Sequence, residues 1–85
     1  MTNTEIKQTI KPFLLENFLF TKDSSALADG ASLIGGGIVD STGILELIEF
    51  IEQSYGLHIA AEEMVPANFD SLDAISVFVR GKLLQ

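Results

Sequence analysis

The sequence predicts a small all-α protein: a four-helix bundle of three main helices and one short helix, with a long loop between helices 1 and 2. Apolar residues recur every three or four positions in three separate segments, which is typical of helices with one buried face. No segment shows the strict alternation of apolar and polar residues that is typical of strands. The chain has 85 residues, which suffices for a single domain, residues 1–85, with a modest core.

The first helix is expected over residues 2–18. Thr2 and Glu5 have the spacing of a capping box, in which each side chain satisfies a free backbone N–H at the helix start. Pro12 lacks a backbone donor and clashes with the preceding turn, so we expect a kink or break near residues 8–12. The predicted buried face consists of Ile6, Ile10, Phe13, Leu14 and Phe18.

Residues 19–40 are predicted to form one long loop, because Gly, Asp and Ser interrupt any periodicity there. A loop of about 20 residues is unusual in a compact domain and is often functional. The residues expected to attach it to the bundle are Leu27, Leu33, Ile34 and Ile38.

The second helix is predicted from Ser41 to Tyr55, with Gly56 as its C-terminal stop. Three acidic residues recur at a spacing of three and lie outside its apolar stripe: Glu46, Glu49 and Glu52. The predicted stripe is Ile44, Leu47, Ile48, Ile51 and Tyr55.

A short connector follows, with one helical turn expected near residues 60–64 or 66–69. The last helix is predicted over residues 70–84, capped by Asp70 or Ser71. Arg80 and Lys82 suit its C-terminal end, and its apolar face is predicted to be Leu72, Ile75, Phe78, Val79 and Leu83.

Composition excludes several functions. The net charge is −7, with 12 acidic and 5 basic residues, which argues against nucleic acid and anionic membranes as partners and suits basic proteins. The chain has no cysteine, so it has no disulfide, no thiolate metal site and no thiol of its own. No apolar run approaches the roughly 20 residues that span a bilayer, and the N-terminus does not resemble a signal peptide. We therefore expect a monomeric, cytoplasmic protein without membrane insertion.

The dipeptide Asp-Ser occurs three times, at residues 23–24, 40–41 and 70–71. A hydrolase serine needs a paired base, and the only histidine, His58, has no recognisable serine partner, so we expect it at the surface. No spacing of His, Cys, Asp and Glu indicates a metal site. A serine can instead be a target for modification. Only Ser41 follows a Gly-rich loop and precedes an acidic helix, although composition alone favours helix capping as the explanation of its position.

Residues 37–56, G-I-V-D-S-T-G-I-L-E-L-I-E-F-I-E-Q-S-Y-G, resemble the attachment segment of acyl carrier proteins. The stretch P-A-N-F-D-S-L-D-A-I-S-V-F-V resembles the last two helices of the same family, and standalone D-alanyl and aminoacyl carriers are the most similar members. The resemblance covers residues 30–84. It implies that Ser41 carries 4′-phosphopantetheine, transferred from coenzyme A by a separate magnesium-dependent phosphopantetheinyl transferase. The arm's thiol would hold an acyl or aminoacyl cargo as a thioester.

The resemblance also implies partners and further site residues. The carrier is not an enzyme, and it would meet an acyl- or aminoacyl-activating ligase and a downstream acyltransferase or synthase. Asp40 would be the motif neighbour of the attachment serine. The expected partner-binding residues are Thr42, Glu46, Leu47, Glu49 and Glu52, and Phe69 is expected near the arm.

The chain departs from the family at two positions beside Ser41. Thr42 stands where Leu is common, and Gly43 should weaken the helix by about 1 kcal/mol relative to Ala while allowing close approach of an arm or a partner. These departures favour an aminoacyl or specialised carrier over a fatty-acid carrier.

Two other interpretations compete with a carrier. An unmodified helical module could bind a basic partner through Glu46, Glu49 and Glu52, because acidic residues can form a docking face. A fragment of a larger synthase is disfavoured by the short chain and its initial Met.

Overall fold

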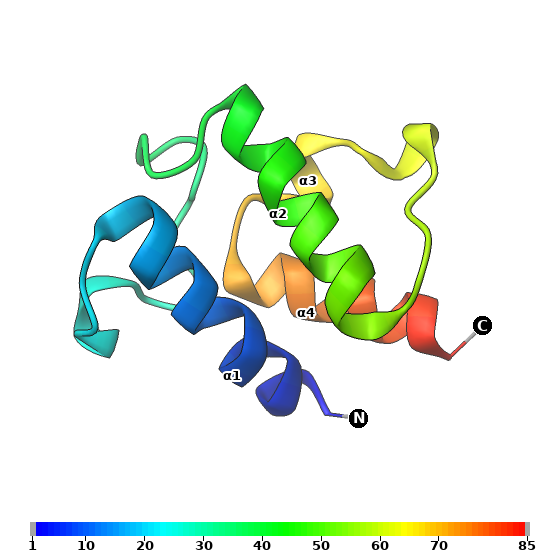
Figure 1. Cartoon of the computed structure of the whole chain (residues 1–85), viewed down its shortest axis with the longest axis horizontal. Helices are drawn as coiled ribbons and strands as arrows, with labels where there is room; N and C mark the ends of the chain where they lie inside the picture. The colour runs from blue at the N-terminus through cyan, green and yellow to red at the C-terminus, as the bar shows by residue number, and fades with distance from the viewer. Residues whose placement is uncertain (1, 85) are drawn as a thin grey trace.

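The computed structural model describes residues 2–84 and contains four α-helices, one π-helical turn and two 3-10 turns (Figure 1). Within these residues there is no strand, and no helix is long and apolar enough to cross a membrane. The predicted all-α class is confirmed. The elements are, in chain order, α1 (Asn3–Leu14), a π-helical turn (Leu15–Leu19), a 3-10 turn (Ser24–Ala26), α2 (Ser41–Tyr55), a 3-10 turn (Ala61–Glu63), α3 (Pro66–Phe69) and α4 (Leu72–Leu83).

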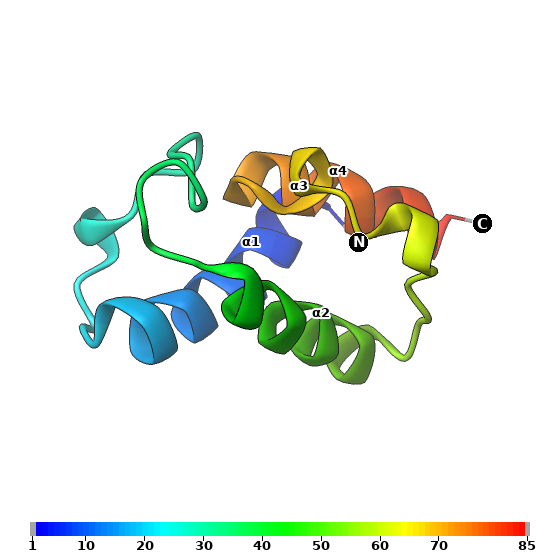
Figure 2. The same cartoon turned by 90° about the horizontal axis from the view of Figure 1, so that it is seen from above.

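Helix α1 packs against α4, and the short α3 packs against α4. Figure 2 shows α2 on one side of the molecule and α3 with α4 on the other side. Helix α1 runs obliquely from one side to the other. The long loop closes one end of the bundle, and the connector from α2 to α3 closes the other (Figure 1).

The N-terminal capping box is confirmed, since the Thr2 hydroxyl accepts from the Glu5 N–H and the Glu5 carboxylate accepts from the Thr2 N–H. Of the kink or break expected near residues 8–12, the break is wrong, because α1 continues through Pro12 to Leu14. The kink stays a prediction. Pro12 lies on the exposed side of the helix, so water can satisfy the carbonyl that its missing N–H leaves unpaired.

The helix changes its pitch after Leu14 and ends in the π-helical turn. Phe20 follows in the left-handed conformation, with φ 54°, and its N–H donates to the Leu15 carbonyl. A π turn holds one more residue than an α turn and thus changes which side chain faces the core. Phe18 is half-buried there and meets the Phe13 ring edge-on, with ring centroids 6.0 Å apart.

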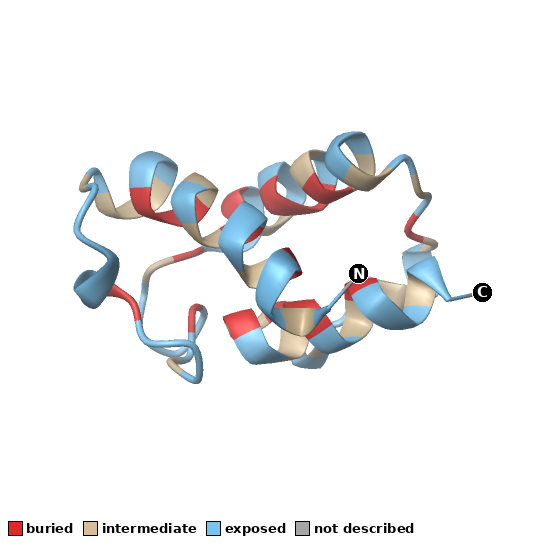
Figure 3. Ribbon diagram, turned by 90° about the horizontal axis from the view of Figure 1, so that it is seen from below, coloured by how far each residue is buried: buried red, intermediate tan, exposed pale blue. Residues whose placement is uncertain are grey.

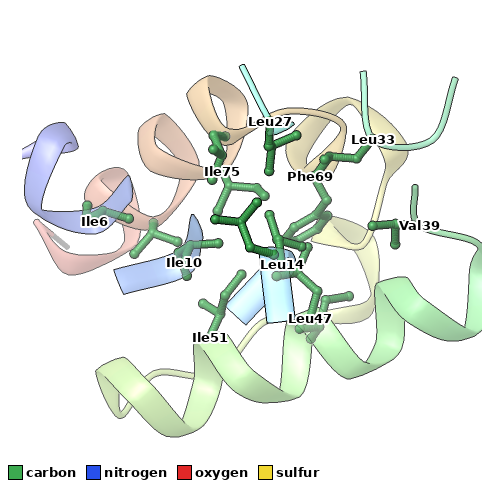
Figure 4. Close-up of a cluster of buried hydrophobic side chains, with 14 of the residues drawn as sticks. Ile6, Ile10, Leu14, Leu27, Leu33, Val39, Leu47, Ile51, Phe69 and Ile75 are labelled. Carbon is green, nitrogen blue, oxygen red and sulfur yellow. The ribbon is translucent and has the colours of Figure 1, made fainter. Parts of the chain in front are cut away.

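One hydrophobic cluster forms the core, and the buried sides of all helices face it (Figures 3 and 4). The long loop contributes Leu27 and Leu33, as predicted, and also Val39, which was not predicted. Ile34 is 37% exposed, so its predicted burial is wrong, and Ile38 is half-buried. The fully or nearly fully buried residues with large apolar side chains are Ile6, Ile10, Leu14, Leu15, Leu27, Leu33, Val39, Leu47, Ile48, Ile51, Ile59, Phe69, Leu72, Ile75 and Val79.

Helix α2 has the predicted bounds. Asp40 caps its start, and Gly56 ends it in the left-handed conformation, with φ 63°. Of the predicted stripe, Leu47, Ile48 and Ile51 are buried, whereas Ile44 and Tyr55 are half-buried.

Both helical turns considered for the connector are present, one before and one after Met64. Helix α4 begins at Leu72, later than expected, because Ser71 is the N-cap. Phe78 is half-buried, and Leu83 is 38% exposed, so the last turn of α4 contributes less to the core than predicted. Arg80 and Lys82 lie in that last turn, as expected.

Gly43 is buried in the first turn of α2, against the π-helical turn. A Cβ at this position would lie 2.7 Å from Cε1 of Phe18 and 3.0 Å from Cγ1 of Val39. The close approach that Gly43 allows is made by the chain's own Phe18, whereas an approach by an arm or a partner stays a prediction. The Phe18 ring also meets Phe13 edge-on, so moving it away from Gly43 would disturb this contact.

We expect Gly43→Ala to lower the free energy of unfolding. Overpacking costs about 1–3 kcal/mol, and over most of this range the cost exceeds the roughly 1 kcal/mol gained from helix propensity. Gly81→Ala in α4 is the matched control, because a Cβ there meets nothing within 4 Å, and it should stabilise by up to about 1 kcal/mol. Urea unfolding followed by circular dichroism measures both. Equal stability of the two variants would contradict the packing argument, and Phe18→Leu should partly rescue Gly43→Ala.

Candidate functional site

The candidate site begins at the Asp40-Ser41 pair, where the loop meets α2. The Asp40 carboxylate accepts a hydrogen bond from the Gly43 N–H at 2.8 Å and thereby caps the helix. Ser41 is the first helical residue and is exposed, and none of the described side-chain hydrogen bonds uses its hydroxyl. The capping role that could have explained Ser41 thus belongs to Asp40.

The other two Asp-Ser pairs have different roles. Ser71 is itself the cap of α4, since its hydroxyl accepts from the Ala74 N–H at 3.0 Å. Ser24 is exposed, but it begins a 3-10 turn of only three residues, whose cap is Asp23. Of the three serines, only Ser41 is an exposed residue with an uncommitted hydroxyl at the start of a long helix.

An apolar hollow of about 300 Å³ lies beside Ser41, between the start of α2 and the connector to α3. Three of its apolar residues are well exposed: Ile34 at 37%, Met64 at 39% and Val65 at 42%. The full lining is Ile34, Asp40, Ser41, Ile44, Met64, Val65 and Pro66. Phe69, which was expected near this place, is fully buried in the core and does not line the hollow. Met64 and Val65 line the hollow instead. In the sequence, only their position just before α3 could have indicated this.

A second hollow, of about 310 Å³, adjoins the same helix start on the side of the π-helical turn. Thr42 is exposed and lines it, so its expected accessibility to a partner is consistent with the structure. Its lining is Asn17, Phe18, Gly37, Ile38, Asp40, Thr42, Gly43 and Glu46. A larger hollow, of about 430 Å³, lies between α1 and the residues that follow it, and Ser41 does not line it.

The predicted acidic face is only partly available to a partner. Glu46 and Glu49 are exposed. Glu52 is turned toward its own chain, because its carboxylate accepts from the Ile59 N–H at 2.8 Å and lies 3.4 Å from Nδ1 of the exposed His58. Glu52 therefore holds the connector in place.

Leu47 requires a correction. It is fully buried and packs in the core, so it cannot contribute to a partner-binding surface in this conformation. An apolar residue that does lie exposed on α2 is Leu45, at 62%, which the sequence pattern did not single out. Among residues 2–84 no group of His, Cys, Asp and Glu side chains could hold a metal ion.

Asp70 holds the loop that leads to Ser41. Its carboxylate accepts from the Ile34 N–H at 2.9 Å and from the Ser32 hydroxyl at 2.8 Å, and its carbonyl accepts from the Leu33 N–H. The hydrogen bond from the Ile34 backbone, followed by that from the Ser32 hydroxyl, lowers the pKa of Asp70 below 3.8. These bonds fix residues 32–34 against the start of α4.

No protein-family model matches the sequence, and no curated protein is significantly similar to it. A functional assignment therefore depends on the residues of the site themselves.

We expect Asp70→Asn to destabilise the protein at neutral pH. Because the folded-state pKa of Asp70 is lowered, its stabilisation is fully present above its unfolded pKa and is lost as the pH falls through the folded value. The difference in the free energy of unfolding between wild type and variant should therefore shrink on acidification. Urea unfolding at a series of pH values measures it. The exposed Glu62, changed to Gln, is the control. A difference that stays constant down to strongly acidic pH would contradict this role.

Proposed function

We propose that this protein is an acyl or aminoacyl carrier in which Ser41 bears a 4′-phosphopantetheine arm. The observation that carries the proposal is the division of roles at residues 40–41. Asp40 caps α2, and this leaves the exposed Ser41 hydroxyl free to be modified.

The proposed modification is a substitution at phosphorus. The Ser41 oxygen would form a phosphodiester bond to the phosphopantetheine part of coenzyme A, the adenosine bisphosphate part would leave, and the hydroxyl proton would be lost. No described side-chain hydrogen bond joins the Ser41 hydroxyl to a base, so the proposal assigns the general base, together with the magnesium, to a separate phosphopantetheinyl transferase. The chain itself would be a substrate and not a catalyst.

The electrostatics at Ser41 suit an added phosphate. The free N–H groups and the dipole of a helix stabilise negative charge at its N-terminus. The first turn of α2 contains no acidic residue, and Asp40 lies immediately before it. A phosphodiester on the first helical residue is therefore placed where α2 favours an anion.

The surroundings of Ser41 also suit an arm with a long uncharged portion. The apolar hollow beside Ser41 offers Ile44, Met64 and Val65 as the residues that would contact it. When attached, the group supplies a thiol that holds the cargo as a thioester. This thiol is chemistry that the chain lacks, since it has no cysteine.

The proposed partners are the transferase, an acyl- or aminoacyl-activating ligase and an acyltransferase or synthase that accepts the cargo. Glu46 and Glu49 are exposed close to the modification site and would attract basic surfaces of these enzymes. Exposed charges are screened by salt and accelerate encounter more than they hold a complex, which suits a carrier that must leave each enzyme.

The proposal predicts a specific change in intact mass. After incubation with coenzyme A, magnesium and a broad-specificity phosphopantetheinyl transferase, the wild type should gain the mass of one phosphopantetheine group, and Ser41→Ala should gain none. Ser24→Ala is the matched control, because Ser24 also follows an Asp and begins a helical turn at an exposed position. It should be modified like the wild type.

Two results would overturn the carrier assignment. One is no added mass on a wild type that circular dichroism shows to be folded. The other is modification of Ser41→Ala, which would place the arm elsewhere. In the first case the acidic surface of α2 would belong to an unmodified interaction module.

A further inference from the structure

Phe20, which follows the π-helical turn, is 84% exposed and is the most exposed of the large apolar side chains that the structure describes. Figure 1 shows this part of the chain at the end of the molecule far from both termini. Its φ of 54° is a left-handed conformation, which costs free energy in a residue with a Cβ and which Gly or Asn adopts more readily. Neither this exposure nor this conformation is explained by the core or by the site around Ser41. Strained positions of this kind cluster at functional sites, and an exposed ring can serve as a contact.

Two backbone hydrogen bonds hold Phe20 in this position. The N–H groups of Phe20 and Thr21 both donate to the Leu15 carbonyl, the second at 3.1 Å. Leu15 is buried, with 4% of its surface exposed, so these bonds attach the segment to the core. The ring of Phe20 is thus presented to solvent by a backbone that the π-helical turn holds in place.

A hollow of about 430 Å³ lies next to this ring, between α1 and the residues that follow it. Phe20 itself lines a smaller hollow of about 290 Å³, which shares Glu16, Thr21 and Lys22 with the larger one. Pro12 and Leu15 supply apolar surface to the larger hollow, and the hydrocarbon stems of lysine side chains can add to it. Because an apolar cavity of roughly 150 Å³ can hold benzene, the larger hollow has room for a phenyl ring.

The charges around the larger hollow differ from those of the rest of the chain. Its ionisable lining residues are two lysines, Lys11 and Lys22, and one carboxylate, Glu16. The two hollows beside Ser41 contain acidic residues and no basic one. Because the whole chain has a net charge of −7, a negatively charged molecule meets less repulsion at the lysine-bearing end than at Ser41.

We propose that this end of the protein binds a second copy of the same chain, with Phe20 of each copy inserted into the larger hollow of the other. A two-fold contact needs one surface patch that is complementary to itself. The exposed ring and the hollow supply a projection and a recess side by side, and the lysines of each copy face an acidic molecule.

The contact is small, so the dimer should be weak. Stable interfaces use about 20–30 residues from each partner, whereas this patch offers far fewer, and we expect a dissociation constant on the order of 1 mM. At micromolar concentration the protein should be the monomer that the sequence predicts. The inference goes beyond the proposed function and does not need a modified Ser41, which lines neither hollow.

The first test follows NMR signals and translational diffusion of the unmodified full-length protein, without coenzyme A, from about 0.05 to about 2 mM. Diffusion should slow with concentration, and the shift changes should centre on residues 11–24. Salt screens the repulsion between two acidic copies, so association should be at least as strong in about 0.3 M sodium chloride as at low salt.

A second measurement locates the ring. In a mixture of isotope-labelled and unlabelled protein at the highest concentration, filtered NOE spectra should connect the Phe20 ring of one copy with Pro12 and Lys11 of the other. These contacts distinguish insertion into the hollow from stacking of the two Phe20 rings on each other.

Phe20→Asn removes the ring and suits the left-handed backbone, so it should abolish association without loss of stability in urea unfolding. Phe20→Gly provides the same test if Phe20→Asn does not fold. Leu84→Asn is the matched control, because Leu84 is 75% exposed but lies next to the C-terminus, and this variant should associate like the wild type.

Several outcomes would overturn the proposal. These are diffusion that does not change up to about 2 mM, association that survives loss of the Phe20 ring, and association that weakens several-fold with salt. NOE contacts of Phe20 only with its own counterpart would exclude insertion, and shifts centred on Glu46 and Glu49 would place the contact on α2. Because neither coenzyme A nor a transferase is present, each of these failures leaves the carrier proposal unaffected.

Discussion

The long connection between α1 and α2 depends on Asp70. Its carboxylate and carbonyl together engage three consecutive loop residues, and Leu33 among them is fully buried. A second backbone bond, from the Asp73 N–H to the Asp29 carbonyl, joins an earlier part of the loop to α4. Without such ties, closing a loop of this length would cost conformational entropy with little compensation. The position from which α2 starts therefore follows from contacts made at the start of α4.

The helical elements were predictable from sequence because their periodicity and end signals agree. The bounds of α2 follow from Asp40 and Gly56, and the capping box fixes the start of α1. Pro12 was misjudged because the cost of proline depends on which side of a helix is exposed, and sequence shows this only indirectly. The π-helical turn has no simple sequence signature, and it places Phe18 against Gly43 of α2.

The Asp40-Ser41 pair of the candidate site was predictable from sequence, whereas the roles of the residues around it were not. Asp and Ser both favour the N-cap position of a helix. The surrounding structure therefore decides which residue of an Asp-Ser pair caps the helix. Asp40 caps α2, whereas the Asp70 carboxylate accepts a hydrogen bond from the loop and Ser71 caps α4. Likewise, Glu52 was expected at the surface with its neighbours, but the connector that folds back over the end of α2 captures its carboxylate. Such differences arise from tertiary contacts that local spacing does not contain.

The π-helical turn has a consequence for how this chain can change in length. Such a turn is equivalent to one residue inserted into an α-helix. Deletion of one residue between Leu15 and Leu19 would allow the regular helix to continue, and it would rotate Phe18 by about 100° away from Gly43. Substitutions within this segment can be absorbed by repacking, but a deletion changes the register of the side chains between the deletion and the start of the loop. The number of residues here, and not only their identity, thus helps to keep Ser41 at the start of a packed helix.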